Sequence, residues 1–252
     1  MACGLIAGLI GGLLGVGGGI VLIPMLTAWA RFDQHSAHGT GIVGVAFTAL
    51  VGVLVYGKGA SIDVHAALQI TLVALPATVL AARLSPRFAA ARLRQFFGFF
   101  VIAAALILPF RDLLGVGAVG GGLPVMLVIG AISGAISGLL GVGGGTVLVP
   151  SLVLVTGFAQ QLAQGTSLAV ILPSSSAGAI QHARLGHVRA RALPPILAGS
   201  FVGSWAGGAG ALALPGQTLR IIFSLVLLFM GARFVALSRA AEEPVRVDPP
   251  VP

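Results

Sequence analysis

The segment GLIGGLLGVGGGIVLIP, at residues 8–24, recurs as GAISGLLGVGGGTVLVP at residues 134–150, with 13 of the 17 aligned positions identical. The offset is 126 residues, half of the 252-residue chain, and the alignment continues without a gap as far as Thr40 and Thr166. Self-similarity at one fixed offset indicates an internal duplication. The chain is therefore expected to fold as two homologous halves.

The duplication also predicts the domain boundaries. We expect the first repeat to occupy residues 1–119 and the second repeat residues 120–240. Residues 241–252 contain four prolines and charges of both signs, a composition that predicts a short disordered cytoplasmic tail.

Each copy of the repeated segment places glycines and a proline inside an apolar run. In a helix interior a glycine costs about 1 kcal/mol relative to alanine and a proline about 3 kcal/mol. An interrupted helix is tolerated in lipid only where the freed backbone groups face protein or a watery cavity. Two interrupted segments at matching places in two halves therefore indicate a transporter binding site. The alternative is close helix packing through small residues. The residues concerned are Gly15, Gly17, Gly18, Gly19 and Pro24, and Gly141, Gly143, Gly144, Gly145 and Pro150.

The composition indicates an all-α polytopic membrane protein. Hydrophobic residues make up 57% of the chain and charged residues 8%, and the mean hydropathy is +1.08, which excludes an ordinary soluble domain. A spanning helix needs about 20 apolar residues, whereas a transmembrane barrel would show short alternating segments. We expect a multi-pass protein of the bacterial inner (plasma) membrane. Its apolar runs lie near residues 4–30, 40–57, 66–82, 95–110, 123–156, 167–181, 192–214 and 219–237.

The basic residues predict the topology. The net charge is +8, but the arginines lie between apolar runs, where they indicate cytoplasmic loops and not nucleic-acid binding. Matching loops of the two halves differ in net charge. The loop with Lys58 and Asp63 is neutral, whereas the matching loop of the second half has three arginines. Conversely, the four arginines near Arg87 correspond to Arg220 alone. This swap is typical of an inverted repeat.

An inverted repeat requires an odd number of crossings in each half. The pieces on either side of GVGGG are about 11 residues long, or roughly 16 Å of helix, too short for a hydrocarbon core of about 30 Å. If each broken segment enters and returns, three full transmembrane helices remain per half, and the loops holding Arg87 and Arg189 are both cytoplasmic. The alternative is eight full spans in two parallel halves.

These motifs resemble those of the sulfite exporter TauE/SafE family, four-plus-four permeases in which each half opens with a GxGGG segment followed by proline. The resemblance covers nearly the whole chain, and it implies transport of small anions, usually sulfite or organosulfonates. Tyr56 and Gly41 stand opposite His182 and Ser167, so the resemblance does not imply a symmetric site. Its specific parts are GVGGGIVLIP, GVGGGTVLVP, residues 38–40 (HGT), residues 164–167 (QGTS) and residues 182–188 (HARLGHV).

The remaining chemistry favours an anion as the ligand. All six acidic residues are expected in loops or the tail, so no carboxylate is expected at membrane depth to hold a cation. Helix N-termini and successive glycine N–H groups attract anions. The candidate substrate-binding residues are Gly17, Gly18, Gly19, Gly143, Gly144, Gly145, Thr146, His38, Thr40, Gln164, Thr166, Ser167, Ser175, Gln181 and His182.

Several candidates have a structural alternative. Thr40 and Thr166 follow a glycine at the expected start of a helix, where a hydroxyl caps free N–H groups. His38 and Gln164 could be ordinary loop residues, and Ser175 could belong to a patch of serines that joins helices. Gln181 and His182 could reach lipid headgroups.

The predicted function is a permease for a small anion, with potential-driven export. A passive anion channel and a proton-coupled carrier that uses His38 and His182 are the alternatives. No arrangement of nucleophile, base and orienting group can be identified, and no Cys/His spacing suits a metal. We therefore expect no enzymatic activity, cofactor or metal, and only the anion and the lipid bilayer as partners.

Overall fold

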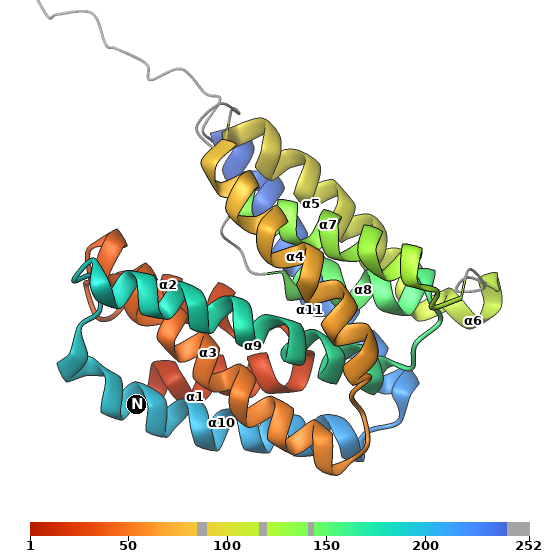
Figure 1. The fold of residues 1–252 in the computed structure, drawn as a ribbon, viewed down its shortest axis with the longest axis horizontal. Helices are drawn as coiled ribbons and strands as arrows, with labels where there is room; N and C mark the ends of the chain where they lie inside the picture. The colour runs from red at the N-terminus through yellow and green to blue at the C-terminus, as the bar shows by residue number, and fades with distance from the viewer. Residues whose placement is uncertain (85–89, 116–119, 141–143, 241–252) are drawn as a thin grey trace, which may run out of the picture.

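The computed structural model describes residues 1–84, 90–115, 120–140 and 144–240, and within these ranges no strand occurs (Figure 1). The all-α prediction is confirmed. The helices of the first half are α1 (Ala2–Leu14), α2 (Gly19–Ala28), α3 (Gln34–Lys58), α4 (Val64–Leu84), α5 (Ala90–Ile107), the 3-10 helix η2 (Leu108–Phe110) and α6 (Arg111–Leu114). Those of the second half are α7 (Leu123–Leu140), α8 (Gly145–Val155), α9 (Gln160–Arg184), the 3-10 helix η3 (Ala190–Ala192), α10 (Leu193–Ala213) and α11 (Gly216–Ala240).

Among the described residues, five helical segments are long and apolar enough to cross a membrane. They are Gln34–Lys58, Val64–Leu84, Arg92–Leu113, Ala190–Ala213 and Gly216–Ala236. We expected a sixth full span, and α9 is as long as α3, but it does not reach the same hydropathy because its interior carries glutamines and a run of three serines. At about 1.5 Å per residue, α1, with 13 residues, and α2, with 10, are too short to cross separately.

The helices pack in pairs that follow the duplication. The most extensive pairings are α1 with α10, α4 with α7, α5 with α11 and α3 with α9. An offset of 126 converts α1 with α10 into α7 with α4. In Figure 1, α1, α2, α3 and α10 form one group and α4, α5, α7 and α11 the other, and α9 contacts helices of both.

Glycines allow the backbones of the first two pairs to touch. A Cβ atom added at Gly8 would lie 2.6 Å from the carbonyl oxygen of Ser200, and one at Gly134 would lie 2.4 Å from that of Ala74. Small residues with this role are common between membrane helices. Close packing of this kind therefore accounts for glycines outside GVGGG as well as for several within it.

The helices α3 and α9 are antiparallel. The backbone N–H of Arg189, just after α9, donates to Thr40 Oγ1 near the start of α3 at 3.1 Å. The matching bond runs from the N–H of Asp63 to Thr166 Oγ1 at 3.0 Å. We call the end of the bundle that holds the start of α3 and the end of α9 the basic end, and the opposite end the distal end.

The two threonines do not cap helix starts, which was the structural alternative to ligand contact. The helix α3 begins earlier, because the side chain of Asp33 accepts a hydrogen bond from the N–H of Ser36 at 3.0 Å and caps it. The helix α9 begins at Gln160 without a side-chain cap. His38 and Gln164 thus lie within helices and not in loops.

The helices of the first broken segment pack against each other. The helix α1 starts at the basic end, where Gly4 packs on Ile196 of α10, and ends at Leu14. The helix α2 then returns along α1, since a Cβ atom at Gly18 would lie 2.3 Å from the carbonyl oxygen of Ala7. The chain emerges again at the basic end, where Asp33 forms an ion pair with Arg189 at 2.8 Å.

Candidate functional site

The first GVGGG loop depends on left-handed backbone that glycine adopts without strain. Gly15, Gly17 and Gly18 have φ values of 72°, 78° and 76°. The helix α2 starts directly after Gly18, and neither α2 nor α8 has a side-chain cap at its N-terminus. Each start therefore presents backbone N–H groups and the positive end of a helix dipole.

The two broken segments meet. A Cβ atom at Gly145, the first residue of α8, would lie 2.8 Å from Cα of Val16 and 3.1 Å from the carbonyl oxygen of Gly15. Thr146 follows in the buried first turn of α8. Gly143, also a candidate, lies outside the described residues.

A cavity of about 530 Å³ adjoins this meeting point. Four of the candidates line it: Gly19, His38, Gly144 and Ser175. A second hollow, of about 750 Å³, shares Val16, Ile20, Pro24, Arg94 and Phe234 with the first, and extends past Gly18 to Arg233 between α2 and α11. The cavity is thus connected to the basic end of the bundle.

Three hydroxyl groups of the cavity wall are already engaged. Thr78, Ser174 and Ser175 each donate to a carbonyl oxygen three or four residues earlier in their own helix, at 2.7 to 2.9 Å. The other donors at the cavity include the backbone N–H groups at the helix starts, the hydroxyl of Ser137, the imidazole of His38 and the guanidinium of Arg94.

Arg94 is a lining residue that the sequence analysis missed. We had assigned it to a cytoplasmic loop, but it lies on α5 and lines both hollows. Arg220 stands 126 residues later, so the pair of matched arginines was a signal that could have identified it.

The residues that correspond to the cavity wall in the other half are buried. Gln164, Thr48 and Ser204 match His38, Ser174 and Thr78, and their exposed fractions are 0%, 1% and 0%. The wall positions that are open on one side of the loops are therefore closed at these three counterparts on the other side.

Gln164 lies in a closed polar cluster at this buried side. The hydroxyl of Tyr56 lies 3.0 Å from the carbonyl oxygen of Gly12 and 3.1 Å from Gln164 Oε1, and its single hydrogen serves one acceptor at a time. Gln164 Nε2 and Ser167 Oγ are buried and have no hydrogen-bond partner among the described residues. Such groups can be satisfied by a ligand or by water.

His182 and His38 lie side by side, and this pair is the repeat counterpart of the pair Tyr56 and Gln164. The ring centroids of His38 and His182 are 5.1 Å apart, and His187 Nδ1 is 3.4 Å from His182 Nδ1. Gln181 is exposed. Thr40 and Thr166 accept hydrogen bonds from the backbone N–H groups of Arg189 and Asp63, as described above.

The model of the family described as "Sulfite exporter TauE/SafE" matches residues 1–234. The chain belongs to the sulfite exporter TauE/SafE family. It is 28% identical to the probable membrane transporter protein YunE of Bacillus subtilis, over 92% of this chain and 94% of YunE. It is 26% identical to the probable membrane transporter protein YdhB of the same organism, over 88% and 96% of the two chains. A probable membrane transporter protein of Methanocaldococcus jannaschii, MJ0441, is 29% identical over 71% of this chain and 69% of its own.

As a TauE/SafE protein, this chain is a multi-pass membrane transporter. The residues that the structure describes around its cavity of about 530 Å³ include one cationic side chain, that of Arg94, and no carboxylate. A guanidinium without a carboxylate partner can bind an anionic group through charge-assisted hydrogen bonds. The electrostatics of the cavity are therefore suited to a negatively charged ligand.

Proposed function

We propose that this protein carries a small anion, sulfite or a small organosulfonate, and that the anion binds where the two GVGGG segments meet. The observation that supports this most directly is the set of donors at the cavity. Two helix starts without a side-chain cap and Arg94 converge there, while the hydroxyl groups of Thr78, Ser174 and Ser175 donate to carbonyl oxygens of their own helices. Helix N-termini of this kind bind anionic groups in other transporters with broken helices.

We further propose inverted repeats with re-entrant hairpins. The antiparallel α3 and α9, with their matched bonds to Thr40 and Thr166, support this topology. So does the position of the hairpins: α1 and α2 enter from the basic end, while α8 ends at the distal end, where Arg111 contacts the carbonyl oxygens of Gly157 and Phe158. By the positive-inside rule the basic end is cytoplasmic, so the cavity faces the cytoplasm.

Export is the direction that needs no coupling ion. One negative charge that leaves a cell held at 100 mV, inside negative, gains about 2.3 kcal/mol, a gradient of nearly fiftyfold. A cavity without a carboxylate offers no obvious site for a coupling cation.

The test is a transport assay with purified protein in liposomes. Sulfite, sulfoacetate, taurine, sulfate and short carboxylates are loaded one at a time, and we expect an inside-negative potential to accelerate efflux of one of them. Saturable exchange between labelled internal and external anion supports a carrier, whereas single-channel steps indicate a pore. If none of these anions moves, the proposed substrate class is wrong.

A proton-coupled carrier is the second candidate, because His38, which lines the cavity, belongs to a cluster of four histidines. His38 contacts His182, and His182 and His35 each contact His187. Histidine is the side chain whose charge changes near neutral pH. Efflux that follows a pH gradient, ignores the potential and is lost in His38→Gln or His182→Gln would favour this candidate.

A further inference from the structure

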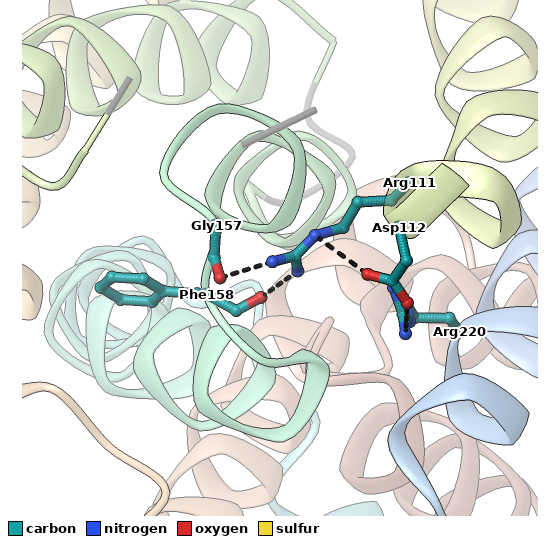
Figure 2. A network of polar contacts seen from close by, with 5 residues as sticks. All are labelled: Arg111, Asp112, Gly157, Phe158 and Arg220. Carbon is teal, nitrogen blue, oxygen red and sulfur yellow. Dashed lines mark hydrogen bonds and ion pairs between the residues drawn. The ribbon is translucent and has the colours of Figure 1, made fainter. Parts of the chain in front are cut away.

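An ion network lies at the distal end of the bundle, and it includes the residue that corresponds to Arg94. Arg220, on α11, matches Arg94 at the offset of 126. Its Nη2 lies 2.5 Å from Asp112 Oδ2, and the other carboxylate oxygen of Asp112 lies 3.8 Å from Nε of Arg111 (Figure 2). The guanidinium of Arg111 also donates to the carbonyl oxygens of Gly157 and Phe158, each at 2.6 Å. The network thus joins α6, α11 and the turn between α8 and α9.

The two matched arginines are in opposite states. Arg94 is exposed and lines the cavity, and no carboxylate of the described residues lies within ion-pair distance of it. The side chain of Arg220 is 12% exposed, and its Nη1 is buried without a hydrogen-bond partner among those residues. Asp112 corresponds to Ser238 in the second half, and serine has no carboxylate. Of the two matched arginines, only Arg220 therefore has a carboxylate partner at this repeat position.

We propose that Arg220 is a second anion-binding residue, which contacts the transported oxyanion when the distal side is open, and that the carboxylate of Asp112 occupies it in the closed state seen here. The inference rests on the proposed function. A carboxylate and a sulfite or sulfonate group present similar oxygen acceptors to a guanidinium. An incoming anion therefore competes with Asp112 for Arg220, and its arrival releases α6 from α11.

The first experiment measures transport of labelled sulfite separately from each side, in right-side-out and inside-out membrane vesicles. Loss of one charge-assisted hydrogen bond predicts that Arg220→Gln raises KM from the distal side about tenfold or more and leaves KM from the basic side nearly unchanged. Arg94→Gln should do the reverse. Arg92→Gln is the matched control, since Arg92 is exposed on the same helix as Arg94 and does not line the cavity.

Asp112 provides the decisive contrast. If Asp112 competes with the anion, Asp112→Asn lowers KM from the distal side about two- to fivefold, the range of exposed ion pairs. Asp112→Glu should restore the wild-type value. An ion pair that only stabilises the fold predicts instead that Asp112→Asn and Arg220→Gln lower the thermal stability together and change KM equally from both sides, which would overturn the inference.

A second readout does not depend on transport. In a Cys3→Ser background, a cysteine at Thr48 reports the buried distal side, where Thr48 is 1% exposed. Asp112→Asn should increase labelling of that cysteine from the distal side by about two- to fivefold, in parallel with KM. Unchanged labelling would contradict the role of Asp112, whether or not sulfite is carried. Wild-type protein that moves none of the tested anions would contradict the proposed function separately.

Discussion

The two GVGGG segments have the same five residues and different environments. Gly18 has a φ of 76°, whereas its counterpart Gly144 has a φ of −65°. On the helices that follow, Gly19, Ile20, Ile23 and Pro24 are partly exposed, while their counterparts on α8 are buried. One sequence pattern therefore serves as an open wall in one half and as a closed wall in the other. Under alternating access, transport exchanges these two environments.

The largest effect should come from removing the glycine that the loop requires. Gly18→Ala places a Cβ atom 2.3 Å from the carbonyl oxygen of Ala7 in left-handed backbone, which strains the loop by about 1–2 kcal/mol before any clash is counted. We expect loss of folded protein, measured as the yield of the monodisperse peak in size-exclusion chromatography. The control is Gly144→Ala, whose Cβ atom meets no atom of the described residues closer than 3.8 Å.

Gly144 separates folding from transport. Because a Cβ atom there meets the described residues only at van der Waals distance, and Gly144 lines the cavity, Gly144→Val should retain the yield and thermal stability of the wild type while transport is lost. The β-branched side chain would occupy the space in which the anion approaches the backbone. Normal transport by Gly144→Val would show that the anion binds elsewhere.

Cysteine accessibility measures the difference between the two walls directly. In a Cys3→Ser background, a water-soluble thiol reagent applied at the basic end should label Ser174→Cys at least about tenfold faster than Thr48→Cys, a factor equivalent to about 1.4 kcal/mol. The two positions are repeat counterparts, so the comparison controls for local sequence. Equal rates would mean that both walls are open in the membrane.

Topology can be tested in the same background. The loops of Arg87 and Arg189 are both predicted to be cytoplasmic. Arg87 lies outside the described residues, so Arg92 is used in its place. Cysteines at Arg92 and Arg189 should both resist an impermeant reagent in intact cells, since both lie at the basic end. One labelled and one protected position would exclude inverted repeats.

The smallest effect is expected at the exposed ion pair of the basic end. Hydrogen bonds from Ser36 and Arg189 hold the pKa of the Asp33 carboxyl well below its usual range. A lowered folded-state pKa means that the contribution of Asp33 is present above the unfolded pKa of about 3.9 and is lost as the pH falls through the folded value. The difference in melting temperature between wild type and Asp33→Asn should therefore be small and constant from about pH 5 to pH 8. A difference that varies across this interval would contradict the assignment.

The sequence predicted the helical class, the site of each break and the family, because these depend on local composition and on one repeated motif. It did not predict which helix faces which. Tyr56 and Gln164 are 108 residues apart and meet only because α3 packs on α9, and hydrophobic periodicity does not select a partner helix. Arg94 was missed for a related reason: positive-inside counting uses the charge of an arginine and ignores where its side chain points.

The pairing of α1 with α10 has a consequence for biogenesis. The first helix of the chain packs its glycine face on residues that begin near Ile196, so most of the polypeptide must leave the ribosome before that face is covered. Until then the hairpin of α1 and α2, in which each helix is too short to span, lacks the helix that covers its glycine face in the folded protein. The N-terminal half is therefore expected to complete its fold after synthesis of the C-terminal half, and the two halves should assemble by exchange of helices and not as independent units.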